Sequence, residues 1–154
     1  MWKRTVGSIA AIIIFTLISA LHGADSLKTY DTRAIDAFMD GMDLEAAGDF
    51  EQAILAYKRA ISYDPQAVDI HFSLAKLYLQ SQQKDLAQAS LLNVIKYDSR
   101  HVDALELLGE MSQSDQEHVL ALGYFERVLD IDYNNDYAIL QSAQIHHADR
   151  KSVV

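Results

Sequence analysis

The chain has 154 residues and a formal net charge of −9, from 13 Lys and Arg residues against 22 Asp and Glu residues. Half of its residues are hydrophobic, and it contains no Cys, one Pro and six Gly. This length is typical of one domain with a buried core. The absence of Cys excludes a disulfide scaffold, a thiolate metal site and a cysteine nucleophile, and the acidic balance argues against a nucleic-acid binder. The shortage of Pro and Gly leaves little turn chemistry for a many-stranded β fold.

The N-terminal segment predicts export. Lys3 and Arg4 precede an uncharged apolar run at residues 6–21, which is the order of residues in an export signal. A buried core helix is the alternative, but the run has no polar face at helical spacing. No small-x-small cleavage site follows, so residues 1–24 are either a cleaved signal peptide or an uncleaved signal anchor. The remainder is then periplasmic or extracellular if cleavage occurs, and otherwise membrane-anchored with its folded part outside.

A repeat with a period of 34 runs through the chain after a linker at residues 25–33. Several columns keep one size class at this step. The small columns are Gly41, Ala75, Gly109 and Ala143, and Ala53, Ala87 and Ala121; the large column is Tyr57, Leu91 and Phe125; an acidic column is Asp64, Asp98 and Asp132. A small residue lets two helix backbones approach, and a large residue fills the space beside them. Chance periodicity in an alanine-rich helical protein is the alternative, which the agreement of several columns disfavours.

Each unit predicts two helices joined by a short break. In the second unit, polar Gln80–Lys84 interrupts apolar residues at helical spacing. In the first unit the break is Ala47–Asp49, where Gly48 can adopt the left-handed conformation that ends a helix. In the third unit Ser112–Glu117 makes the break without a glycine. One helix pair cannot bury its apolar face alone, so stacked pairs would form the core.

The segment Ala47–Pro65, AGDFEQAILAYKRAISYDP, together with these columns, resembles the tetratricopeptide repeat (TPR). The resemblance implies an all-α fold, a right-handed superhelical solenoid of antiparallel helix pairs, here preceded by an apolar N-terminal helix. Asp40 stands where the first unit should carry Leu, so we expect it at the exposed N-terminal edge. The expected units are TPR 1 at 34–67, TPR 2 at 68–101, TPR 3 at 102–135 and the first helix of an incomplete fourth TPR at 136–148.

The resemblance also implies that the first helices line a concave groove that binds peptides or proteins. The groove positions carried over to this chain are Phe38, Met42, Glu45, Asp69, Phe72, Lys76, Leu79, Asp103, Glu106, Glu110 and Gln113. Family members that hold the C-terminal carboxylate of heat-shock chaperones use Lys, Arg and Asn. Here Lys76 is the only basic candidate and acidic residues would repel a carboxylate, so we reject that clamp.

The groove instead presents an apolar strip beside an acidic patch, which suits an apolar or basic partner segment. The alternative is that the acidic residues form an ordinary solvated face and that the aromatic side chains serve packing between repeats.

No pattern for catalysis or metal binding stands out, and we expect no catalytic residue, no metal and no cofactor. The alternation of Asp and Asn over residues 130–136 begins like a calcium loop, but Asn135 replaces the required Gly and Gln141 the required Glu. His146 and His147 are adjacent, so their rings point to different faces of a helix. No phosphate loop, dinucleotide fingerprint or nucleophile elbow occurs.

The C-terminal residues suggest a foreign sequence. Read as the codons GAT CGG AAG AGC GTC GTG, residues 149–154 resemble a common sequencing adapter, and the alternative is a genuine polar tail. The helix expected before them, at 136–148, keeps an apolar face that a second helix would cover.

These patterns predict a non-catalytic interaction scaffold or adaptor, exported or membrane-anchored, that binds a protein or peptide segment in the groove. The alternative is the N-terminal TPR region of a longer, truncated protein whose catalytic or sensory domain is missing. We expect no nucleic-acid partner, and membrane contact through residues 6–21 only. The identity of the partner and the oligomeric state do not follow from the sequence.

Overall fold

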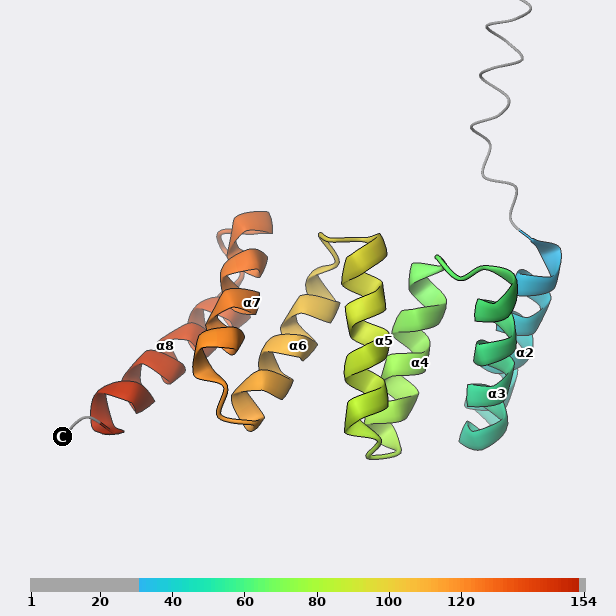
Figure 1. Cartoon of the computed structure of the whole chain (residues 1–154), viewed down its shortest axis with the longest axis horizontal. Helices are drawn as coiled ribbons and strands as arrows, with labels where there is room; N and C mark the ends of the chain where they lie inside the picture. Colours follow the sequence, from blue (N-terminus) through green and yellow to red (C-terminus); the bar gives the residue numbers. More distant parts are fainter. Residues whose placement is uncertain (1–30, 153–154) are drawn as a thin grey trace, which may run out of the picture. The chain divides into compact units, whose positions relative to one another are not determined.

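The computed structural model describes residues 31–152, which form seven α-helices and no strand (Figure 1). The helices are α2 (Thr32–Ala47), α3 (Phe50–Tyr63), α4 (Val68–Gln80), α5 (Lys84–Tyr97), α6 (Val102–Ser114), α7 (His118–Ile131) and α8 (Asp136–Ser152). The all-α class is therefore confirmed. The export signal and the apolar helix expected at residues 1–24 lie outside the described residues. Within the described part of the chain, none of the helices has the length and apolar character needed to cross a bilayer.

Successive helices pack as pairs. The closest packing is between α2 and α3, between α4 and α5, and between α6 and α7, and each pair then contacts the next through α3–α4, α5–α6 and α7–α8 (Figure 1). Each pair buries one face inside itself and another against its neighbour, which is the packing expected of a solenoid.

The small and large columns meet inside each pair. A Cβ atom added to Gly109 would lie 2.7 Å from Cε1 of Phe125, and one added to Gly41 would meet the ring of Tyr57. In the second repeat the same two columns hold Ala75 and the smaller Leu91, and both side chains are fully buried. A glycine in the small column is thus paired with an aromatic ring in the large column, because a Cβ atom and the ring would occupy the same space.

The turn between the two helices of each repeat contains one residue with a left-handed backbone conformation, at positions 34 residues apart. Gly48 has φ +84°, Gln82 has φ +59° and Gln116 has φ +62°. Each of these residues donates its backbone N–H to a carbonyl three residues earlier, which helps to close the end of the first helix. The third repeat therefore breaks without glycine as predicted, and a glutamine adopts the conformation that glycine adopts in the first repeat.

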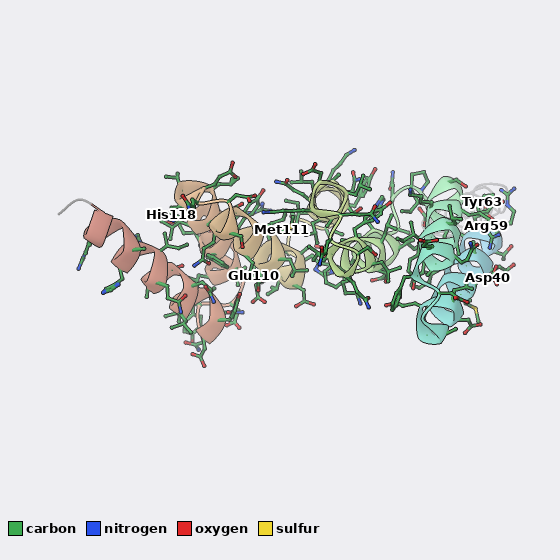
Figure 2. All side chains as sticks on the ribbon, turned by 90° about the horizontal axis from the view of Figure 1, so that it is seen from below. Asp40, Arg59, Tyr63, Glu110, Met111 and His118 are labelled. Carbon is green, nitrogen blue, oxygen red and sulfur yellow. The ribbon has the colours of Figure 1, made fainter. Side chains whose placement is uncertain are left out.

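Two features concern the ends of the helical region. Asp40 is exposed, as expected, and its Oδ2 accepts a hydrogen bond from Nη2 of Arg59 at 2.6 Å (Figure 2). At the other end, α8 continues to Ser152, beyond the expected end at Ala148. Residues 149–152 contain neither Gly nor Pro, so the backbone has no residue that would end the helix there.

Candidate peptide-binding groove

The groove positions recur on the first helix of each pair. The positions on α2 are Phe38, Met42 and Glu45; those on α4 are Asp69, Phe72, Lys76 and Leu79; those on α6 are Asp103, Glu106, Glu110 and Gln113. Their spacing of three or four residues places each set on one side of its helix.

Phe72 of α4 contacts the residue that directly precedes α6. Its ring lies 4.7 Å from the ring of His101, the residue that precedes α6, and the ring itself is only partly buried. Nζ of Lys76 lies 5.4 Å from the centroid of the same ring, within the range of a cation–π contact. The ring of Phe72 thus has two neighbours, one from its own helix and one from the turn before α6.

The other apolar groove residues are Phe38, Met42 and Leu79, and they differ in how far they are exposed to solvent. The ring of Phe38 lies 5.4 Å from that of Tyr57 and packs against the core, whereas Met42 is 50% exposed. Leu79 is partly buried and borders an open hollow of about 430 Å³ that Glu110 and Met111 also line. Figure 2 labels these last two residues on α6. Phe38, Phe72 and Leu79 are therefore all partly buried against the core, and Met42 is the most exposed of the four apolar groove residues.

Three of the acidic groove residues are already hydrogen-bonded within the fold. Oε2 of Glu45 accepts from the Tyr57 hydroxyl at 2.6 Å, and Oε1 of Glu106 accepts from Nδ2 of Asn135 at 2.9 Å. Oε1 of Glu110 accepts from the hydroxyl of Tyr137. These contacts join a first helix to a second helix or to the next repeat, so these glutamates have a structural role.

The two tyrosines in these contacts resist ionisation. Burial raises the pKa of Tyr57 well above its ordinary value, and the hydrogen bond and the charge of Glu45 raise it further. Burial also raises the pKa of Tyr137, with Glu110 adding to the effect. Both hydroxyls therefore remain hydrogen-bond donors at any physiological pH.

The remaining groove acids are free of such contacts. Asp69 and Asp103 occupy the same place in the second and third repeats, at the start of α4 and of α6. Both are exposed, and neither side chain has a hydrogen bond or an ion pair with any other described residue. Gln113, near the end of α6, is partly buried. All five groove carboxylates contribute negative charge, and the two aspartates differ from the glutamates in having side chains with no partner among the described residues that holds them in place. Asp69 lies three residues before Phe72, and Asp103 lies two residues after His101.

Sequence reasoning missed His101, Asn135 and Tyr137. His101 and Asn135 hold the same place in successive repeats, and each accepts a backbone N–H at the start of the following helix, His101 through Nδ1 at 3.3 Å and Asn135 through Oδ1 at 2.8 Å. The preference of Asn for this capping position was the available signal. Among the described residues there is no group of three His, Asp or Glu side chains placed to hold a metal ion.

Family models identify the repeats. The model described as "TPR repeat" matches residues 44–82, and the model described as "Tetratricopeptide repeat" matches residues 74–136.

Curated relatives match across the same region. BBSome complex member BBS4 of Bos taurus is 31% identical over 108 residues, which are 70% of this chain and 20% of that protein. BBSome complex member bbs-4 of Caenorhabditis elegans is 30% identical over 91 residues, which are 58% of this chain and 20% of that protein. The chain thus spans about a fifth of the length of these relatives.

Solved structures share the fold. The first TPR of Spaghetti (RPAP3), bound to the HSP90 peptide SRMEEVD, has a TM-score of 0.66 at 20% identity and covers 76% of this chain and 93% of its own. MamA protein has a TM-score of 0.68 at 24% identity and covers 77% of this chain and 65% of its own. Residues 44–136 of this chain are therefore tetratricopeptide repeats, a family of protein–protein interaction modules.

Proposed function

We propose that this protein is a non-catalytic scaffold or adaptor that binds a partner segment with apolar and basic side chains along α2, α4 and α6. The observation that carries the proposal is the partly exposed ring of Phe72, held between Lys76 and His101. An anchored aromatic ring with open surface is the kind of residue that contributes most to binding a protein segment.

The free charges of the groove favour a basic segment. Glu45, Glu106 and Glu110 are hydrogen-bonded inside the fold, but Asp69 and Asp103 are exposed without a partner among the described residues. They supply the negative potential that attracts Lys or Arg side chains and repels carboxylates. The similar structure of RPAP3 holds the acidic peptide SRMEEVD, and we propose that this chain rejects such a peptide.

A pair of peptides tests the charge preference. Fluorescence anisotropy would compare SRMEEVD with SRMKKVK, in which Lys replaces the three acidic residues, and we expect SRMKKVK to bind at least about tenfold more tightly at low salt. The preference should shrink as salt rises, because exposed charges are screened. Replacing Asp69 and Asp103 with Asn should remove most of it, whereas the same change at exposed Asp85 and Asp130, on α5 and α7, should not. Equal binding of both peptides would contradict the proposal.

A second test concerns the ring. Phe72→Ala should weaken binding of SRMKKVK and of any captured partner while the helix content measured by circular dichroism is retained. Val119→Ala is the matched control, because Val119 is 88% exposed on α7, a second helix. Undiminished binding by Phe72→Ala would place the binding surface away from the groove.

We also propose export, on the charge pattern of residues 1–24 alone. A reporter enzyme that is active only outside the cytoplasm, fused after residue 30, should be active, and deleting residues 6–21 should abolish its activity. The mass of the purified protein would then separate a cleaved signal peptide from a retained anchor. An inactive fusion would contradict export.

A second candidate function is that these repeats are the N-terminal region of a longer protein and serve a catalytic or sensory domain encoded further on. The observation that favours it is the exposed apolar surface of α8, where Ile139 is 47% exposed and Leu140 is 54% exposed.

A further inference from the structure

The residues that directly precede α4, α6 and α8 differ in their ability to cap these helices. Ala67, His101 and Asn135 hold these places and stand 34 residues apart. Nδ1 of His101 accepts the backbone N–H of Ala104 at 3.3 Å, and Oδ1 of Asn135 accepts that of Ala138 at 2.8 Å. The side chain of Ala67 has no atom that can accept. The same cap is therefore absent before α4, made by a titratable ring before α6, and made by an amide that does not titrate before α8.

The cap before α6 requires a neutral imidazole. A backbone N–H can only donate, so Nδ1 of His101 must carry a lone pair and the ring hydrogen must lie on Nε2. In the imidazolium form Nδ1 also carries a hydrogen, and two donors would then face each other at the N–H of Ala104. The positive charge would also lie at the positive end of the α6 dipole. Since His101 is only partly buried, a proton from solvent can reach the ring and remove the cap.

His101 also contacts the groove. Its ring lies 4.7 Å from the ring of Phe72 on α4, and the helix that it caps carries the groove residues Asp103, Glu106 and Glu110. A change in the protonation of His101 therefore acts on an aromatic groove residue and on the start of the helix that holds three acidic ones.

Charged and titratable groups lie on every element that meets the turn at residues 98–101. They are Asp69 and Lys76 on α4, Asp98 and Arg100 in the turn itself, and Asp103 and Glu106 on α6. In addition, Nη2 of Arg127 on α7 donates to the carbonyl of Ser99 at 3.1 Å, and the ring of His71 on α4 stacks 5.9 Å from that of Tyr97 at the end of α5. Asp69, Asp103 and Glu106 are groove positions, so a positive charge added near them would oppose binding of a basic segment.

We propose that His101 is a positioning residue of the groove, which closes the start of α6 and supports the ring of Phe72 while its imidazole is neutral, and that acidification therefore weakens binding of a basic segment. This regulation rests on the proposed function, because it acts on the same groove. Asn135 is the reference within the chain, since its amide makes the same cap without gaining or losing a proton. His101→Asn should therefore keep the cap and remove its dependence on pH.

Amide exchange of the protein without ligand tests the cap. An ordinary histidine changes its charge between about pH 5 and 8, so protection factors would be compared at about pH 7.5 and about pH 5.5. The protection of the Ala104 N–H should fall about fivefold or more on acidification in the wild type, which is the size of effect that loss of a cap produces. It should stay constant in His101→Asn and be low at both pH values in His101→Ala. His146→Asn, at an exposed site on α8, is the matched control and should respond as the wild type does. Equal responses of the wild type and His101→Asn would overturn the proposal and would point to His71.

Peptide binding tests the consequence for the groove. The peptide SRMKKVK, labelled at its N-terminus so that its own charge is constant, should bind the wild type about fivefold or more weakly at about pH 5.5 than at about pH 7.5. His101→Asn should lose less than about twofold. Equal losses in both proteins would overturn the regulation while leaving the proposed function intact. No binding by either protein at about pH 7.5 would overturn the proposed function and the regulation with it, and the exchange of the Ala104 N–H would then show only whether the cap itself titrates.

Discussion

The first and last described helices, α2 and α8, expose residues of different polarity to solvent. On α2, Asp36, Asp40 and Asp43 occupy the positions that hold buried apolar residues on α4, and Asp40 is paired with Arg59. On α8, the exposed residues Ile139 and Ala143 occupy the positions of Leu105 and Gly109, which lie against α7 on the previous first helix. A repeat array must change its residues wherever it ends, because a face built for packing is poorly hydrated. The difference teaches that the same repeat exposes acidic residues on its first described helix and uncharged residues such as Ile139 and Ala143 on its last.

The largest expected effect compares the two faces of α8. Ile145→Ala should destabilise the protein by about 2–5 kcal/mol, because a side chain that is 1% exposed leaves a cavity against α7. Ile139→Ala, on the open face, should cost less than about 1 kcal/mol, because its side chain is 47% exposed. Urea denaturation of both variants measures the difference. Similar losses would show that the open face of α8 is already packed in solution.

A second comparison concerns two positions of the small column, Gly109 packed against Phe125 and Ala143 exposed to solvent. Gly109→Ala should cost about 1–3 kcal/mol despite the better helix propensity of Ala, because the new methyl group meets the ring of Phe125. Adding Phe125→Leu should recover part of that loss by making room. At α8, Ala143→Leu in the same column should change stability by no more than about 0.5 kcal/mol, because the site is open. Thermal unfolding of the four proteins provides the measurement. An unharmed Gly109→Ala variant would show that the pairing of small and large columns is not tight.

The breaks inside the first and third repeats permit a third comparison. Gln116 has φ +62°, a conformation that costs a non-glycine residue about 1 kcal/mol, so Gln116→Gly should stabilise the protein by up to about 1 kcal/mol. Gly48→Ala, with φ +84°, should destabilise it by a similar amount, about 1 kcal/mol. The midpoint of urea unfolding reports both changes. If Gln116→Gly weakened the protein, contacts of the glutamine side chain would outweigh the backbone strain.

The smallest expected effect is the change in stability at alkaline pH that Tyr57 on α3 and Tyr137 on α8 cause. The pKa of Tyr57 and that of Tyr137 are raised by folding, so each hydroxyl contributes stability that is complete below the unfolded pKa of about 10. That contribution declines as pH rises from about 10 towards the folded pKa. The stability advantage of the wild type over Tyr57→Phe should therefore shrink above about pH 10, and Tyr137→Phe should behave likewise. Stability curves from pH 8 to 11 measure it, and parallel curves for the wild type and a Phe variant would contradict a pKa raised by folding at that tyrosine.

The repeat was readable from the sequence because its signals are local and periodic. The regular step, the small and large columns and Asp40 at the edge each follow from residue size or polarity, and the helices lie where these predict them. The helix end at α8 was less predictable, since residues 149–152 contain no residue that ends a helix.

The state of the groove was decided by tertiary structure. Tyr57, Asn135 and Tyr137 lie 12, 29 and 27 residues from the glutamates that they bind, and each comes from a different helix or turn than its partner. Residue type indicates that a glutamate can accept a hydrogen bond, but only the packing of helices sets which donor reaches it. The sequence by itself therefore determined the repeat and its columns, whereas the tertiary structure decided which acidic side chains are held in place: Glu45, Glu106 and Glu110 each bind a donor from another helix or turn, and the side chains of Asp69 and Asp103 bind none among the described residues.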